Sequence, residues 1–326
     1  MIERARQPLT RLGLQIPSFT YPGVTGGQLF DRIVDIATTG ERSGFDSIWV
    51  MDHFFQIRGV GAPDEPMFEA YTLLAGIAAR TSTARLGAMV TGVTYRNPAF
   101  LAKVVTNLDV ISAGRAVLGI GAAWNEDESR AYGWDFPPVR ERFERLEEAL
   151  QICRAMFTKA SPSFEGKHYR IEEALNEPRP VQTDGPPILI GGGGERKTLR
   201  LVARYGDACN FFGDASTVRH KLDVLERHCE EVRRDPAEIT KTRLGSLIVA
   251  PTHEEAERRA VEVRQARRMS DEWFRAGTTV GDPDEVAEGA RALLDAGLDG
   301  LLFNVWPAGD VEAVALAGET LSKVVA

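Results

Sequence analysis

Hydrophobic residues along the chain form two kinds of segment that follow one another repeatedly. Short apolar runs such as 12–16 and 116–121 are typical of buried strands, and they do not alternate with polar residues. Longer segments such as 28–42 and 139–157 place apolar residues three and four positions apart, which predicts amphipathic helices. Strands without alternation suit a parallel sheet that is covered on both faces. The pattern therefore predicts a chain of strand–helix units.

Eight such units can be counted, each with a strand followed by a helix. The expected strands are 12–16, 46–51, 85–90, 116–121, 188–190, 207–212, 244–250 and 300–305. Eight units in one chain of this length predict a single (β/α)8 barrel over residues 1–326, with a doubly wound open sheet as the alternative. Two segments break the rhythm and are expected as insertions after the fourth and seventh strands, at about 159–186 and 251–283.

Composition excludes several other classes of protein. The net charge is -8, whereas proteins that follow nucleic-acid phosphates usually carry a basic face. No apolar run is long enough to cross a membrane, and the first ten residues lack the apolar core of a signal peptide. The cysteines are odd in number, without metal-ligand spacing, which indicates a reduced, cytoplasmic setting and no metal. We therefore expect no nucleic-acid, membrane or metal partner.

In a (β/α)8 barrel the active site forms at the carboxyl ends of the strands. The second strand ends with Asp52 and His53, and a histidine can gain or lose a proton near neutral pH. A histidine that bonds a backbone carbonyl, and an aspartate that caps the following turn, are the structural alternatives. We predict that Asp52 and His53 are catalytic. Other strand ends supply the expected substrate pocket, which comprises Gln15, Phe54, Trp124 and Trp306.

A glycine run follows the fifth strand, at Gly191, Gly192, Gly193 and Gly194. Glycines let the backbone approach a ligand closely, and the N–H groups at a helix start attract an anion. This predicts a phosphate site, with Arg196 or Lys197 as charge partners. A tight turn with positive φ is the alternative. The run is neither a Walker loop nor a dinucleotide fingerprint.

A further indication comes from five segments taken together, 47–54, 84–103, 118–133, 164–169 and 187–207. They resemble the luciferase-like monooxygenase family, most closely its deazaflavin (coenzyme F420)-dependent branch. The resemblance runs nearly end to end in the same order. It implies a (β/α)8 barrel with an insertion after strand four, an oxidoreductase activity that uses coenzyme F420, and a homodimer, since family members are often dimers.

The resemblance also implies roles for individual residues. Asp52 and His53 occupy positions that contact the cofactor ring and the substrate, and Thr91 and Asn125 occupy positions that bond the cofactor. A cis peptide without proline is expected near Ala88 and Met89, behind the ring. The glycines after strand five match the family's phosphate-binding loop.

One position departs from the family pattern. The sugar-phosphate dehydrogenases of the deazaflavin branch carry a glutamate where this chain has Ala122. We therefore do not expect glucose 6-phosphate as the substrate.

The hypothesis is hydride transfer between C5 of F420 and a small organic substrate. His53 would hold or move the substrate proton, and Asp52 would orient His53. Two alternatives stay open: an FMN-dependent monooxygenase that receives reduced flavin from a separate reductase, and a flavin-binding protein without catalysis.

Overall fold

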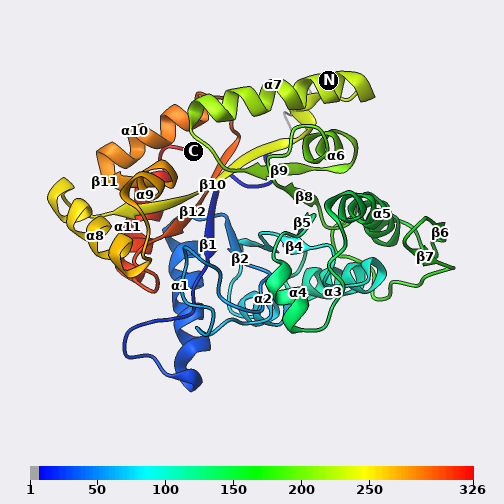
Figure 1. The fold of residues 1–326 in the computed structure, drawn as a ribbon, viewed down its shortest axis with the longest axis horizontal. Helices are drawn as coiled ribbons and strands as arrows, with labels where there is room; N and C mark the ends of the chain where they lie inside the picture. Colours follow the sequence, from blue (N-terminus) through cyan, green and yellow to red (C-terminus); the bar gives the residue numbers. More distant parts are fainter. Residues whose placement is uncertain (1–6) are drawn as a thin grey trace.

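The computed structural model describes residues 7–326, the side chain of Trp273 excepted. The start of the chain, on which the expectation of no signal peptide rests, lies largely outside these residues. Within the described chain, eight parallel strands close into a barrel because β10 pairs with both β9 and β12 (Figure 1). The strands are β1 (Leu12–Ile16), β2 (Ser47–Val50), β3 (Arg85–Ala88), β5 (Ala116–Gly121), β8 (Ile188–Gly191), β9 (Ala208–Phe211), β10 (Thr240–Val249) and β12 (Gly300–Val305).

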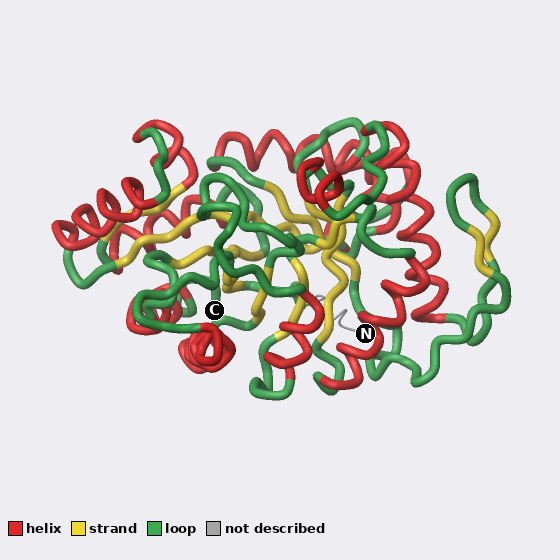
Figure 2. Tube along the Cα trace, turned by 60° about the horizontal axis from the view of Figure 1, so that its bottom comes forward, coloured by secondary structure: helices red, strands yellow, loops and turns green. Residues whose placement is uncertain are grey.

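Helices surround the strands, as Figure 2 shows. Asn97 caps one of them by accepting a hydrogen bond from Ala99 N at 2.9 Å, and Pro98 takes the first helical position, as its fixed φ favours. The prediction of a (β/α)8 barrel is confirmed. The covering helices are α1 (Leu29–Ser43), α2 (Ala70–Ala78), α3 (Pro98–Ile111), α5 (Val139–Thr158), α6 (Thr198–Tyr205), α7 (Ala215–Val232), α10 (Pro283–Leu294) and α11 (Val311–Leu321).

Side chains fill the inside of the barrel. Trp49 is fully buried there, and its indole N–H donates to Ser47 Oγ at 2.8 Å. The inner cluster comprises Trp49, Met89, Val117, Leu189, Ala208, Leu244 and Leu302. Because the interior is packed, a ligand binds at the end of the barrel and not within it.

Further elements lie in the two segments expected as insertions. The first contains a hairpin, formed by β6 (Phe164–Glu165) and β7 (Arg170–Ile171), which stands out at one edge in Figure 2. The second contains α8 (His253–Ala266), α9 (Asp271–Gly277) and β11 (Thr278–Gly281), and β11 adds a parallel strand beside β10. No strand was predicted at β11.

Some boundaries differ from the prediction for a clear physical reason. β10 begins at Thr240, four residues before the predicted start at Leu244. Its first residues are polar, but Lys241 forms an ion pair with Asp299 at 3.4 Å, and Thr242 bonds Cys209 O. These contacts satisfy the polar groups within the sheet, which hydrophobic patterning does not reveal.

No helix of the described chain is long and apolar enough to cross a membrane. No group of three or more potential metal ligands occurs among residues 7–326.

Candidate active site

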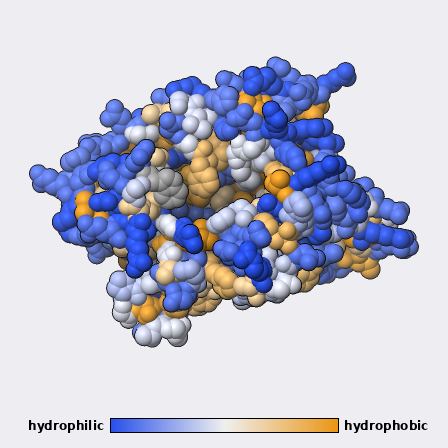
Figure 3. Space-filling view, viewed as in Figure 1, coloured by the Kyte–Doolittle hydropathy of each residue, from blue (hydrophilic) through white to orange (hydrophobic). Residues whose placement is uncertain are grey.

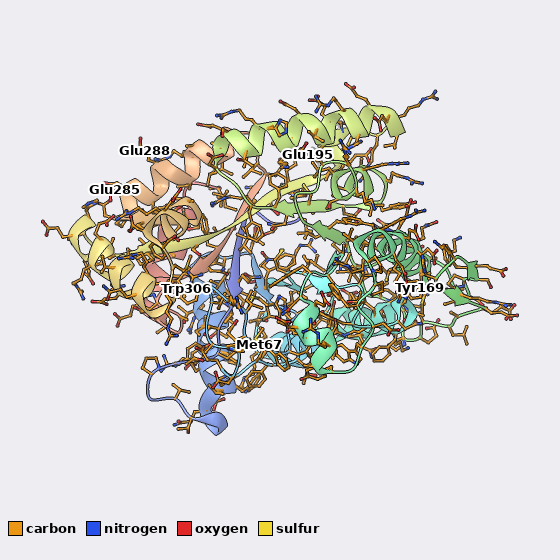
Figure 4. All side chains as sticks on the ribbon, in the orientation of Figure 1. Met67, Tyr169, Glu195, Glu285, Glu288 and Trp306 are labelled. Carbon is orange, nitrogen blue, oxygen red and sulfur yellow. The ribbon has the colours of Figure 1, made fainter. Side chains whose placement is uncertain are left out.

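Asp52 and His53 follow β2 at its carboxyl end, as predicted. The face of the molecule drawn in Figure 3 is hollowed near its centre, and apolar surface lines part of the hollow. Figure 4 places Met67 and Trp306 near this centre, whereas Tyr169, Glu285 and Glu288 lie toward the edge.

The His53 ring is held by one carboxylate. Nδ1 lies 2.8 Å from Glu128 Oε2, and the side chains of His53 and Glu128 are 12% and 0% exposed. In the described part of the chain, no group hydrogen-bonds Nε2 of this ring. The indole of Trp124 meets the ring edge to face, with 5.4 Å between centroids. One ring nitrogen is thus fixed by the protein and the other is left for a ligand.

Glu128 lies on α4 (Glu126–Ala131), a short helix that follows β5. Its Oε1 accepts the backbone N–H groups of Phe54 at 2.5 Å and Phe55 at 3.0 Å, while Oε2 also accepts the Tyr95 hydroxyl at 2.9 Å. Burial raises the pKa of Glu128, but the bonds from His53, Phe55 and Phe54 outweigh burial and lower the pKa below its ordinary value. The carboxylate is therefore ionised near neutral pH.

Asp52 is buried in a different set of contacts. Its carboxylate accepts hydrogen bonds from Arg96 Nη1 and Nη2 at 2.8 and 2.9 Å, and from Gly92 N at 3.2 Å. Arg96 also binds Glu69 at 2.6 Å. Burial raises the pKa of Asp52, and the Arg96 guanidinium counteracts that rise. The expectation that Asp52 orients His53 was wrong, because the carboxylate on the ring is Glu128.

The glycine run forms a loop between β8 and α6. Gly192 has a φ of 119°, a left-handed value that favours glycine, and its N–H donates to Asn210 O. The N–H groups of Gly193 and Gly194 make no hydrogen bond within residues 7–326. These free donors suit an anion such as a phosphate.

Basic side chains near this loop differ from those predicted. Lys221 Cε would lie 3.8 Å from a Cβ at Gly193, and its ammonium pairs with Glu195 at 2.6 Å. Arg243 donates to Gly213 O, while its buried Nη1 has no partner among the described residues. Lys197, in contrast, lies over the Phe143 ring. Lys221 is thus a basic side chain that lies beside the loop, while Arg196 or Lys197 as charge partners stay a prediction.

The end of the third strand is tightly packed. The cis peptide without proline joins Met89 to Val90, one bond beyond the expected pair of Ala88 and Met89. Both Ala88 and Met89 are buried. Gln15 donates its amide N–H to Met89 O at 3.0 Å. A Cβ at Gly191 would meet Val90 at 2.7 Å, so the first glycine of the loop is required by packing alone.

Two further predicted residues have contrasting surroundings. Thr91 is fully buried, and its hydroxyl bonds the Tyr71 hydroxyl at 2.6 Å, so the side chain already has a partner. Asn125 is half-buried at the start of α4, and its side chain makes no capping bond. The Asn125 amide is thus the better placed of the two to bond a cofactor.

The aromatic residues of the predicted substrate pocket have different surroundings. Trp124 is 63% exposed and stands beside His53. Phe54 instead packs against Tyr95 and Trp134, with centroids 5.1 and 5.0 Å away. It also lines a cavity of about 500 Å³ beside α2 and α3. Phe54 therefore lies next to this cavity, which Phe100 of α3 also lines.

Trp306 is buried and not an open wall. It is 5% exposed, packs with Ile248 and Phe274, and has the Arg267 guanidinium 4.3 Å above its ring. Its indole N–H has no partner among the described residues. A role for Trp306 in the substrate pocket stays a prediction.

The sequence model of the luciferase-like monooxygenase family matches residues 10–268. The chain belongs to this family. The resemblance stated from the sequence is thereby confirmed.

Relatives of this luciferase-like protein include the F420-dependent glucose-6-phosphate dehydrogenase of Kineococcus radiotolerans, 30% identical over 93% of both chains. The enzyme of the same name from Nocardia farcinica is 30% identical over 84% of this chain and 87% of its own. Among solved structures, an F420-dependent secondary alcohol dehydrogenase in complex with an F420–acetone adduct is similar, with a TM-score of 0.79 and 20% sequence identity. The match covers 97% of this chain and 99% of that one. That structure shares the fold.

Sequence reasoning missed the two residues that organise this luciferase-like site. Glu128 stands beside Glu126 and Asp127, which are 62% and 79% exposed, and nothing in the sequence marks the third acid as buried. Arg96 directly precedes the Asn97 cap and reads as an ordinary surface residue. Their importance follows only from the folded arrangement.

Proposed function

We propose that this luciferase-like protein is an F420-dependent oxidoreductase that transfers a hydride between C5 of the deazaflavin and a small organic substrate. The relatives that are 30% identical over most of the chain carry the name of F420-dependent dehydrogenases, which supports the choice of coenzyme. The observation that carries the proposal is His53, whose Nδ1 is bound by Glu128 while Nε2 has no partner in the described chain.

The residues around the site fit a coenzyme with a phosphate and a polar ring. The free N–H groups of Gly193 and Gly194, with Lys221 beside them, would hold the phosphate. Asn125 would bond the ring. F420, when bound, supplies a carbon that accepts or donates a hydride, and the protein supplies position and electrostatics.

His53 would handle the proton that accompanies the hydride. The ionised Glu128 stabilises a positive charge on the ring, so His53 can accept a proton at Nε2 from a substrate hydroxyl or donate one to a carbonyl oxygen. Trp124 would cover the substrate beside this nitrogen. Asp52 would have a structural role and take no part in proton transfer, because its carboxylate oxygens already accept hydrogen bonds from Arg96 and Gly92.

The substrate of the relatives is not carried over to this chain. Ala122 replaces the glutamate expected for sugar-phosphate dehydrogenases, and its backbone oxygen accepts Arg142 Nη1 at 3.2 Å. The hollow in Figure 3 is partly apolar. We therefore propose an uncharged carbonyl compound or conjugated alkene, or the matching alcohol.

Anaerobic turnover tests this function. Reduced F420 is mixed with a panel of ketones, aldehydes and conjugated alkenes, and oxidised F420 with alcohols, and the change in coenzyme absorbance is followed with wild-type protein. We expect coenzyme oxidation or reduction without oxygen for at least one compound. Product formation that requires both oxygen and reduced FMN would instead establish the monooxygenase alternative.

The homodimer implied by the family resemblance is part of the proposal. On α3, Phe100 and Ile111 are 60% and 52% exposed, and these apolar side chains border the cavity of about 500 Å³. A second copy of this face would cover them. Light scattering on wild-type protein and Phe100→Asp tests this, with a dimer expected for the wild type and a monomer for the variant.

A cytoplasmic location is also proposed, since all three cysteines are unpaired and buried.

A further inference from the structure

We propose that Glu128 is a positioning residue that fixes His53 as the tautomer with its proton on Nδ1, which leaves Nε2 as the atom that exchanges a proton with the substrate. The tautomer is set by side chains of this protein and does not depend on a bound coenzyme or substrate. Its consequence for turnover rests on the proposed function.

The first argument is the chemistry of the contact between the two side chains. An ionised carboxylate can only accept hydrogen bonds, so the ring atom that faces it must carry hydrogen. Glu128 Oε2 lies 2.8 Å from Nδ1, a normal distance for a charge-assisted bond. The lowered pKa of Glu128 keeps the carboxylate ionised near neutral pH. Neutral His53 therefore carries its proton on Nδ1.

The second argument is that Glu128 has no freedom to turn away. Its Oε1 accepts two backbone N–H groups, those of Phe54 and Phe55, and its Oε2 accepts the Tyr95 hydroxyl as well as the ring. The side chain is 0% exposed. Because Phe54 directly follows His53, the same carboxylate fixes both the backbone and the ring of this segment.

The neighbouring charged groups do not offer His53 another partner. Asp52 is bound by Arg96, which also holds Glu69. Tyr95 stays neutral, since burial and the nearby Glu128 both raise its pKa. Trp124 meets the ring edge to face and presents no acceptor. Glu128 is thus the group that decides the tautomer.

Glu128→Gln reverses the tautomer for a geometric reason. Two backbone donors face Oε1, so the glutamine must place its carbonyl oxygen there and its NH₂ group toward His53. An NH₂ group donates, so Nδ1 must become the acceptor and the proton must move to Nε2. Replacing the acid of a catalytic triad by its amide has this effect in serine proteases and costs about 10⁴ in turnover.

The test is ¹⁵N–¹H correlation NMR of histidine-labelled protein without coenzyme, in which protonated and unprotonated ring nitrogens resonate far apart. His53→Gln assigns the signals. We expect Nδ1–H in the wild type and Nε2–H in Glu128→Gln. His228 is an internal reference, because its Nε2 must donate to the Glu195 carbonyl at 2.8 Å in both proteins.

Two further variants separate positioning from stability. Glu41→Gln is the matched control, since Glu41 also accepts backbone N–H groups, from Ser82, Thr83 and Ala84, but contacts no histidine. It should leave the His53 signals unchanged. Glu128→Asp keeps the charge and should retain Nδ1–H. If Glu128→Gln does not fold, the wild-type and Glu128→Asp spectra still decide the proposal.

The proposal is overturned if wild-type His53 carries its proton on Nε2, or if Glu128→Gln folds and leaves the tautomer unchanged. These spectra need no coenzyme, so they stand even if the F420 proposal fails. In the turnover assay we expect Glu128→Gln to lower kcat by about 10²-fold to 10⁴-fold with KM and coenzyme affinity kept. An equal loss with Glu41→Gln would indicate a structural effect only.

Discussion

Arg96 donates two hydrogen bonds, of 2.8 and 2.9 Å, to the carboxylate of Asp52, and the side chains of Arg96 and Asp52 are 9% and 1% exposed. Asp52 immediately precedes His53, so this pair anchors the backbone on one side of the histidine. Glu128 anchors the ring and the backbone on the other side. His53 thus stands between two carboxylates, Asp52 and Glu128, whose side chains are both shielded from water.

Removing one partner of the buried pair should be costly. We expect Arg96→Met to lower the free energy of unfolding by about 3–5 kcal/mol, because Asp52 would be left buried without its cation. Urea unfolding measures this. Arg130→Met is the control, since Arg130 and Glu126 form an exposed pair, 69% and 62% accessible, and should lose less than about 1 kcal/mol. Equal losses would mean that the Asp52 pair is not a special element of the site.

His53 should affect turnover more than binding. We expect His53→Gln to lower kcat by about 10²-fold or more, as for a general acid–base group, with coenzyme affinity largely kept. His253→Gln provides the control, because His253 is 58% exposed and pairs with Glu285 away from the strand ends. Unchanged turnover in His53→Gln would contradict the role of His53 in proton transfer.

The phosphate loop can be tested with two lysines of equal exposure. Lys221 and Lys241 are each 18% exposed and each paired with a carboxylate, but only Lys221 lies beside Gly193. Lys221→Met should weaken coenzyme binding about tenfold, because a charge-assisted contact to a phosphate is lost. Lys241→Met should bind as the wild type does. Isothermal titration at low and high salt measures both, and a smaller salt dependence is expected for Lys221→Met.

Much of the architecture was predictable from the sequence. Strand 300–305 appears where its hydrophobic run predicted it. The start of β10 and the added strand β11 were not predictable, because their residues are polar or lack a clear period, and neighbouring strands supply their partners.

The site was predictable only in part. Asp52, His53 and the glycine run follow strand ends, which a barrel brings together. Glu128 and Arg96 were missed because only their burial distinguishes them from surface charges. That burial depends on contacts with residues 75 and 44 positions away in the sequence. A charged residue on a short polar helix reads as solvent-exposed until the fold is known.

Acid should weaken the Glu128 contribution to stability. Its folded pKa lies below the ordinary value of 4.5, so its stabilising effect is fully present above that value and is lost as the pH falls through the folded pKa. We expect the stability difference between wild type and Glu128→Gln to shrink as the pH falls below 4.5. Urea midpoints across the pH range measure this. Glu126→Gln, at a 62% exposed site, should show a small difference at every pH.

Competitive titration of the coenzyme-free protein tests the central claim most directly. Purified protein is titrated with F420 and with FMN, each alone and each against the other, while fluorescence and heat are recorded. The account predicts saturable F420 binding at one site per chain, with FMN binding more weakly and displaced by F420. Tight FMN binding without measurable F420 binding would contradict it.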